Sequence, residues 1–186
     1  MTTVLFVCTA NQCRSPMAVL FARQALAQRE PQVQVMGAGT SAAGARPVTP
    51  ATAKVMARRG LDASAHRSSG ILEALSPEPD LVIGLAREHA RTVVEERPEM
   101  FPKTFTLKDL VRRATDAGPR GHNEDLASYL SRLGAGRGFS SLAGWAATDE
   151  VADPVGQPLA AHERCAAELE TLVGALVDHL WPPPRS

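Results

Sequence analysis

The chain has 186 residues, of which 44% are hydrophobic and 22% are charged, a composition typical of a globular protein with a buried core. Its 20 Lys and Arg residues balance its 20 Asp and Glu residues, so it has no basic excess of the kind that general nucleic-acid or membrane-surface binders need. The length fits one domain better than two. We therefore expect a single domain over residues 1–186 that binds neither nucleic acid nor membranes.

The three cysteines are too few for a disulfide framework, and no Cys or His cluster has the spacing of a zinc site. The first residues do not have the basic and apolar regions of a secretory signal, and no apolar run approaches the roughly 20 residues of a membrane span. These features predict a cytoplasmic protein with reactive thiol chemistry, with no metal and no other cofactor.

Strands and helices alternate in the first part of the chain. The apolar, β-prone run over residues 4–7 is typical of a buried parallel strand. A helix is expected after it, with Ser15 as the N-cap and Pro16 at the first helical position. The elements predicted next are a strand over 32–36, a Gly- and Ser-rich turn over 37–44, a helix over 49–59 closed by Gly60, a strand over 80–83, a helix over 87–96 stopped by Pro98, and a strand over 103–107.

The second part of the chain is predicted to be mostly helical. Two amphipathic helices are expected, with inward faces made of Leu107, Leu110, Val111 and Ala114 and of Leu126, Tyr129, Leu130 and Leu133. Asn123 fits the N-cap of the second of these helices. The Gly-rich stretch over 134–144 follows a helix rather than a strand, so we interpret it as a loop and not as a nucleotide fingerprint. The clearest periodicity is in the last helix, whose apolar face consists of Cys165, Leu169, Leu172, Val173, Leu176 and Leu180.

The residues with the strongest chemical pattern are Cys8-Thr-Ala-Asn-Gln-Cys-Arg-Ser15, which lie between the first strand and the first helix. A loop of this length can fold around one tetrahedral oxyanion with its N–H groups pointing inward. Arg14 can bind two phosphate oxygens in a bidentate pair. The same positive potential favours the thiolate of Cys8, which would lie in line for attack on a bound phosphoryl group.

This segment resembles the signature of the low-molecular-weight protein tyrosine phosphatases. The resemblance rests on VLFVCTANQCRSPMA over residues 4–18 and on Asp153-Pro154, with support from residues 38–41, 66–68 and 105–107. It implies an α/β, flavodoxin-like three-layer fold whose four-stranded parallel sheet has the order 2-1-3-4 and helices on both faces. Residues 108–148 fall outside the resemblance and are expected to form an insert that is atypical of the family.

The resemblance also implies two-step hydrolysis of phosphomonoesters on proteins. Cys8 would form a phosphocysteine, Arg14 would steady the phosphoryl group, and Asp153 would act as general acid and then activate water. Asp149 and Glu150 are nearby rivals for the acid role, but no Pro follows them. The implied substrate-binding loop consists of Thr9, Ala10, Asn11, Gln12, Cys13 and Ser15. A supporting network beneath it would include Ser41 and His66.

The other two cysteines have separate interpretations. Cys13 is either a packing thiol or a partner that pairs with Cys8 when that thiol is oxidised. Cys165 lies on the apolar face of the last helix and is expected in the core.

Three positions depart from the family pattern. Ala10 replaces the usual Gly, Gln12 matches neither the tyrosine-directed relatives nor the phosphoarginine-directed ones, and Val155 replaces an aromatic wall for the substrate ring. Phosphotyrosine in proteins is therefore the expected substrate by family default, with phosphoarginine as an alternative. A small-thiol-dependent arsenate reductase is the other alternative. The sequence gives no oligomeric state.

Overall fold

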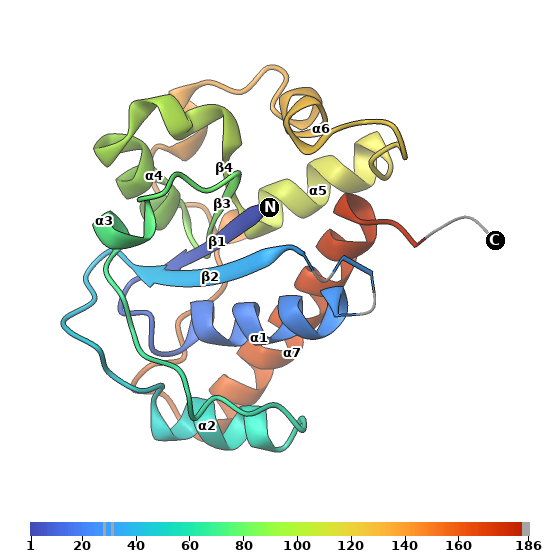
Figure 1. Ribbon diagram of the computed structural model, residues 1–186. Helices are drawn as coiled ribbons and strands as arrows, with labels where there is room; N and C mark the ends of the chain where they lie inside the picture. Colours follow the sequence, from blue (N-terminus) through green and yellow to red (C-terminus); the bar gives the residue numbers. More distant parts are fainter. Residues whose placement is uncertain (28, 31, 184–186) are drawn as a thin grey trace.

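The computed structural model describes residues 1–27, 29–30 and 32–183 of the chain, in which strands and helices alternate (Figure 1). In chain order the elements are β1 (Thr3–Cys8), α1 (Arg14–Leu26), β2 (Gln34–Gly39), α2 (Pro50–Ala57), α3 (Ile71–Ala74), β3 (Leu81–Gly84), α4 (Arg87–Glu96), the 3₁₀ helix η1 (Pro98–Lys103), β4 (Thr104–Thr106), α5 (Leu107–Ala117), α6 (Leu126–Leu133), the 3₁₀ helices η2 (Phe139–Leu142) and η3 (Ala147–Asp149), and α7 (Leu159–Leu180).

The four strands form one parallel sheet in the order β2-β1-β3-β4, which confirms the predicted fold class and strand order. β1 lies inside the sheet and pairs with β2 up to Cys8↔Gly39. The carboxyl ends of parallel strands meet at one edge, which is where open α/β sheets bind ligands. Cys8 ends β1, so the loop over residues 8–15 begins at that edge.

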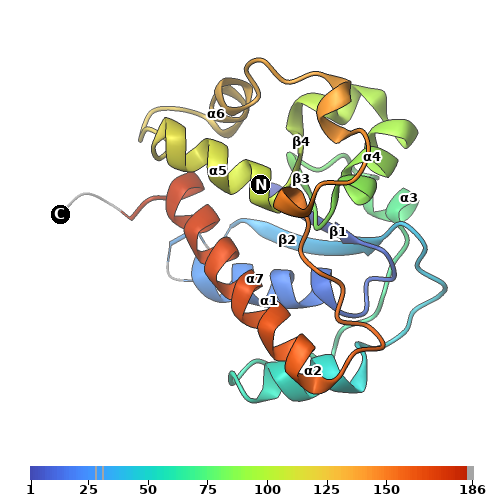
Figure 2. The same cartoon turned by 180° about the vertical axis from the view of Figure 1, so that it is seen from behind.

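Successive side chains of β1 point to opposite faces of the sheet and enter two different hydrophobic clusters. Val4 and Phe6 pack in the larger cluster with side chains of α1 and α7, whereas Leu5 and Val7 pack in a smaller one with side chains of α3 and α4. Figures 1 and 2 show α1, α2 and α7 on one side of the sheet and α3 and α4 on the other. The sheet is therefore the middle layer of three.

Helices α5 and α6, from the segment predicted to be an insert, pack on the body of the molecule. Their buried side chains Leu110, Ala114, Tyr129 and Leu130 belong to the same cluster as those of α1 and α7. The Tyr129 hydroxyl donates a hydrogen bond to the Gly118 carbonyl at 2.8 Å, which ties the two helices together. Both predicted helices are confirmed, but Asp125 rather than Asn123 caps α6, since its carboxylate accepts from the Ser128 N–H.

The second strand differs most from the prediction. It extends to Gly39, so residues 37–39 belong to β2 and not to a turn. A Cβ atom on Gly39 would lie 2.7 Å from the Thr9 carbonyl oxygen and 2.9 Å from the Ala10 carbonyl carbon. Glycine is needed here because the strand passes close beneath the loop over residues 8–15, and a local sequence pattern does not contain that contact.

The first helix begins two residues earlier than predicted. Arg14 is its first residue and Cys13 its N-cap, with no side-chain capping bond. Ser15, the predicted cap, uses its hydroxyl for other contacts, which are described below. The helices predicted over 49–59 and 87–96 are found at Pro50–Ala57 and Arg87–Glu96, and Gly60 has the left-handed backbone (φ 71°) expected after α2. In the described part of the chain, no helix combines the length and apolarity that crossing a bilayer requires.

Candidate active site

The carbonyl groups of the loop over residues 8–15 are held from outside. The Thr40 N–H donates to the Cys8 carbonyl and the Ser41 N–H to the Thr9 carbonyl. The His66 ring donates to the Asn11 carbonyl. The Thr49 N–H donates to the Gln12 carbonyl and the Met17 N–H to the Cys13 carbonyl. In a trans peptide the next N–H points opposite to the carbonyl. We therefore infer that the N–H groups of residues 9, 10, 12, 13 and 14 face the inside of the loop, an arrangement suited to an anion.

Asn11 takes the one left-handed backbone conformation in this loop. Its φ of 53° is the positive value that Asn tolerates better than most residues. Among the described residues, no other non-glycine residue has a positive φ, so position 10 does not require the left-handed backbone conformation that favours glycine. The substitution of Ala for the expected Gly at position 10 is therefore compatible with the loop conformation.

A chain of hydrogen bonds runs beneath the loop from Cys8 to Asn11. The Ser15 hydroxyl accepts from Asn11 Nδ2 at 2.8 Å, which leaves its hydrogen for Cys8 Sγ at 3.0 Å or for the Ala38 carbonyl at 3.5 Å. All of Cys8, Asn11 and Ser15 are buried. A buried hydroxyl that donates to sulfur stabilises a thiolate more than a thiol.

His66 reaches the same loop from the other side. Its Nε2 donates to the Asn11 carbonyl at 2.6 Å, so the proton is on that nitrogen. Burial lowers the pKa of His66, and the charges of Arg23 and Arg67 lower it further, against the opposing effect of the bond to Asn11. His66 is therefore neutral at pH 7 and supports the loop as a hydrogen-bond donor.

Ser41 does not reach this network. Its backbone N–H binds the Thr9 carbonyl at 2.8 Å, but its side chain is exposed and, within the described residues, makes no hydrogen bond. Ser69 contacts Asn11 instead, since its N–H donates to Asn11 Oδ1 at 3.1 Å and its hydroxyl donates to the Gly37 carbonyl. Sequence reasoning missed Ser69, because no local pattern around it indicates a contact with Asn11, which lies 58 positions away.

Arg14 and Asp153 meet at the mouth of the loop. Arg14 is 3% exposed, and its Nη2 lies 2.6 Å from Asp153 Oδ2 and 3.2 Å from the Thr9 hydroxyl. Its Nη1 donates to the Val151 carbonyl at 3.2 Å. Asp153 Oδ1 accepts from the Val155 N–H at 3.1 Å, so both carboxylate oxygens are held. The Asp153 side chain is 42% exposed, which leaves it accessible to a ligand.

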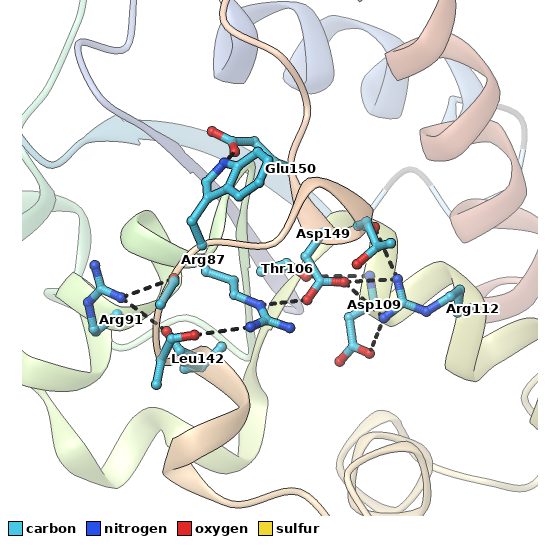
Figure 3. Close-up of polar contacts among 12 residues, drawn as sticks. Arg87, Arg91, Thr106, Asp109, Arg112, Leu142, Asp149 and Glu150 are labelled. Carbon is cyan, nitrogen blue, oxygen red and sulfur yellow. Dashed lines mark hydrogen bonds and ion pairs between the residues drawn. The ribbon is translucent and has the colours of Figure 1, made fainter.

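The segment over residues 139–151, which leads to Asp153, is tied to α4 and α5 (Figure 3). Asp149 is buried, with one carboxylate oxygen 2.7 Å from Arg87 Nε and the other 2.9 Å from two nitrogens of Arg112. Arg91 donates to the Leu142 carbonyl at 3.2 Å. Burial raises the pKa of Asp149, but the bonds from Arg87 and Arg112 outweigh it and leave the pKa below its ordinary value.

Asp149 and Glu150 are both engaged in contacts away from the mouth of the loop. Asp149 is enclosed by its two arginines, and the Glu150 carboxylate accepts from the Trp145 indole N–H. Asp153 is the acidic residue of the three that contacts Arg14.

The other two cysteines are buried free thiols. Burial raises the pKa of Cys13 to about 11 and that of Cys165 to about 12. Both therefore stay protonated near neutral pH, and Cys165 lies in the larger core cluster as expected. Among the described residues, no group of three or more His, Cys, Asp or Glu side chains is arranged to hold a metal ion.

His89 is a further residue at this site that sequence reasoning missed. It lies in the first turn of α4, directly after β3, and its Nε2 is 3.0 Å from the Thr9 hydroxyl. The signal that could have found it is topological, because residues that follow a parallel strand lie at the same sheet edge as the loop.

Comparisons with known proteins agree with this geometry. A model of the family described as low molecular weight phosphotyrosine protein phosphatase matches residues 3–120. The chain is 30% identical to a protein-arginine-phosphatase of Geobacillus stearothermophilus over 177 residues, which cover 95% of each chain. It is 35% identical over 108 residues to a probable low molecular weight protein-tyrosine-phosphatase of Ralstonia solanacearum, over 58% of this chain and 72% of the relative.

Solved structures give the same result. A low molecular weight protein tyrosine phosphatase from T. tengcongensis superimposes with a TM-score of 0.72 at 28% identity, covering 97% of this chain and all of that one (100%). An arginine phosphatase from Geobacillus stearothermophilus superimposes with a TM-score of 0.70 at 29% identity, covering 96% of this chain and 92% of that one. The chain belongs to the low molecular weight phosphotyrosine protein phosphatase family, and it is a cysteine-dependent phosphatase.

Proposed function

We propose that this phosphatase hydrolyses phosphomonoesters on protein side chains through a phosphocysteine at Cys8, with Arg14 and Asp153 as its partners. The observation that carries the proposal is the loop over residues 8–15. Five of its carbonyls are bound by groups outside the loop, and Cys8 Sγ lies beside the Ser15 hydroxyl. Because N–H and carbonyl groups of a trans peptide point in opposite directions, we infer that the N–H groups after these carbonyls face inward. An anion in this loop would lie directly against the thiolate.

The first step begins when the substrate phosphate takes the donors of Arg14 that Asp153 contacts in the free protein. The Asp153 carboxyl released from Arg14 is then available as the general acid. Cys8 Sγ attacks phosphorus, so an S–P bond forms while the P–O bond to the leaving group breaks. Asp153 gives its proton to the leaving oxygen, which departs as the neutral hydroxyl.

The second step is hydrolysis of the phosphocysteine. The Asp153 carboxylate takes a proton from a water molecule, whose oxygen attacks phosphorus. The S–P bond breaks, inorganic phosphate leaves, and the Cys8 thiolate is restored. The Ser15 hydroxyl, 3.0 Å from Cys8 Sγ, stabilises the thiolate as a leaving group.

The proposed substrate is phosphotyrosine in proteins, which the family membership supports. Val155 is 53% exposed next to Asp153, so no aromatic ring is available at that position to stack on the substrate. Phosphoarginine is the second candidate, and the match to an arginine phosphatase over 95% of both chains favours it. Parallel assays on phosphotyrosine and phosphoarginine peptides separate the two, and a higher kcat/KM on phosphoarginine would overturn the first.

Two further expectations belong to this proposal. The location is expected to be the cytoplasm, because three free cysteines fit a reducing compartment. Arsenate reduction with a small thiol remains a prediction from the sequence, and an assay with arsenate and glutathione in place of substrate tests it.

The nucleophile is tested with Cys8→Ser. This variant is expected to lose hydrolysis of p-nitrophenyl phosphate while it still binds inorganic phosphate, because the N–H groups and Arg14 remain. The matched control is Cys165→Ser, which removes a buried thiol of α7 and should keep most of the activity. Substantial turnover by Cys8→Ser would rule out Cys8 as the nucleophile.

The general acid is tested with Asp153→Asn, which keeps the size of the side chain. The rate should fall by about 100-fold or more for poor leaving groups and much less for p-nitrophenol, which departs without a proton. Glu150→Gln is the control, since its carboxylate contacts Trp145. An equal loss of rate for good and poor leaving groups would contradict the role.

A further inference from the structure

The proposed mechanism does not use the contact between His89 and Thr9, although this contact lies at the active site. His89 is 1% exposed, and its Nε2 lies 3.0 Å from the Thr9 hydroxyl oxygen. The same oxygen accepts from Arg14 Nη2 at 3.2 Å, the nitrogen that also contacts Asp153. The Thr9 hydroxyl thus lies where the substrate phosphate would meet Arg14.

The charge of His89 is fixed by its surroundings. Burial lowers the pKa of His89 to about 3, and the positive charge of Arg14 acts in the same direction. The ring is therefore neutral at any working pH, so it carries one proton on either Nε2 or Nδ1. His89 Nδ1 is buried and, within the described residues, has no hydrogen-bond partner.

Two observations favour the proton on Nε2. An unpaired buried N–H donor is rarer in proteins than an unpaired acceptor, which favours a bare Nδ1. In addition, Glu88 Oε1 lies 3.4 Å from His89 Nε2, and a carboxylate oxygen attracts a hydrogen at that nitrogen. His89 then donates to the Thr9 oxygen.

A hydroxyl has two lone pairs and one hydrogen. Arg14 and His89 together occupy both lone pairs of the Thr9 oxygen, so its own hydrogen cannot be used to bind His89 and stays free. We propose that His89 is a positioning residue that turns the Thr9 hydroxyl into a hydrogen-bond donor to the phosphoryl group held in the loop. This inference rests on the proposed function. It adds to the same site the Thr9 hydroxyl as a hydrogen-bond donor and His89 as the residue that orients it.

The variants are chosen so that the hydroxyl and its support can be removed separately. Thr9→Val removes the hydroxyl at nearly constant shape, and His89→Leu removes the ring donor. His89→Gln keeps an N–H close to the Nε2 position, whereas His89→Asn is too short to reach Thr9. The expected loss in kcat/KM is about 10-fold for Thr9→Val and for His89→Leu. The double variant should be no worse than the poorer single one, and His89→Gln should recover most of the activity.

A binding measurement tests the role of His89 without any catalytic turnover. It measures the affinity for inorganic phosphate by calorimetry in a Cys8→Ser background. Thr9→Val, His89→Leu and His89→Asn should each weaken phosphate binding by a similar factor, and His89→Gln should not. Failure of the proposed function would instead show as wild-type protein that hydrolyses neither phosphopeptide. The inference is overturned if the two single losses multiply in the double variant, or if Gln and Asn at position 89 bind phosphate equally. If His89→Leu does not fold, the comparison of His89→Gln with His89→Asn still tests the role of the His89 N–H.

Discussion

The three cysteines are all buried, and we predict that they differ in reactivity because of the groups around them. The thiolate is the form that reacts with alkylating reagents, and the pKa values of about 11 for Cys13 and about 12 for Cys165 leave hardly any thiolate near neutral pH. Cys8 lies beneath N–H groups that attract anions. We therefore predict that iodoacetate at pH 7 alkylates Cys8 first and that inorganic phosphate protects it, as read by peptide mass mapping.

The control for this prediction is Cys8→Ser, which should take up iodoacetate far more slowly. Labelling of Cys13 or Cys165 in the native protein at the rate of Cys8 would contradict it. The raised pKa of Cys13 also favours the packing interpretation of that thiol, because a Cys8–Cys13 disulfide would have to form with little Cys13 thiolate present.

At the residue scale, the groups within the loop segment follow from the local sequence, and His66 and Asp153 follow from the family resemblance, whereas two other groups from distant positions were missed. Cys8, Asn11 and Ser15 lie within eight positions, and the structure joins them by hydrogen bonds. Ser69 and His89 reach the same loop from 58 and 80 positions away. Which serine faces Asn11 depends on how the chain after β2 returns to the loop, and no local pattern near Ser41 contains that path.

At the scale of elements, β2 controls the shape of the loop from below. A Cβ on Gly39 would lie 2.7 Å from the Thr9 carbonyl oxygen and 2.9 Å from the Asn11 backbone nitrogen, and backbone atoms cannot move aside cheaply. Gly39→Ala is therefore predicted to displace the loop at a cost of about 1–3 kcal/mol and to weaken phosphate binding by about tenfold. Calorimetric titration with phosphate measures the effect.

Gly70→Ala is the matched control, because nothing lies within 4 Å of a Cβ built at Gly70, whose φ is −77°. It should bind phosphate as the wild type does. Unchanged phosphate binding by Gly39→Ala would show that the loop does not depend on this close approach.

The clamp of Arg87 and Arg112 on Asp149 fixes the segment that delivers Asp153 (Figure 3). Asp149→Asn is predicted to destabilise the fold by about 1–2 kcal/mol at pH 7, a figure reduced for solvent screening because Arg112 is half exposed. The folded-state pKa of Asp149 is below its ordinary value. The stabilisation is thus complete above the unfolded pKa of about 4 and is lost as pH falls through the folded value.

Urea unfolding of wild type and Asp149→Asn at several pH values tests the clamp. The difference in unfolding free energy should be constant from pH 5 to 7 and should shrink below about pH 4. Asp116→Asn, an exposed carboxylate of α5, is the control and should show little difference at any pH. A difference for Asp149→Asn that grows as the pH falls would contradict this prediction.

Helices and strands could be predicted from the sequence where the pattern of apolar residues determines them. The apolar run of β1 and the periodic faces of α6 and α7 agree with the structure, because burial of those faces creates the pattern. The start of α1 and the end of β2 were wrong, since Ser15 bonds to Cys8 and Asn11 instead of capping, and Gly39 packs under the loop instead of turning. Both errors lie at the candidate site, where function overrides local preference.

At the scale of the whole molecule, we propose that residues 1–186 form one cooperative unit that includes α5 and α6. The supporting observation is that Leu130 of α6 and Val173 of α7 belong to one hydrophobic cluster, together with Phe6 of β1. A separate insert domain would have a core of its own. Shared burial instead means that loosening α6 should lower the stability of the sheet and of the loop it carries.

Leu130→Ala tests this, since Leu130 is 2% exposed. The variant is predicted to lose about 2–5 kcal/mol of unfolding free energy in a single transition, because a cavity opens in the common core. Circular dichroism should report the same midpoint as the exposure of Cys165 in α7 to a thiol reagent. Leu72→Ala, at a side chain that is 63% exposed, is the control and should change the midpoint little. Two separate midpoints in Leu130→Ala, with Cys165 still protected after the first, would show that α6 unfolds on its own and that the chain holds two units instead of one.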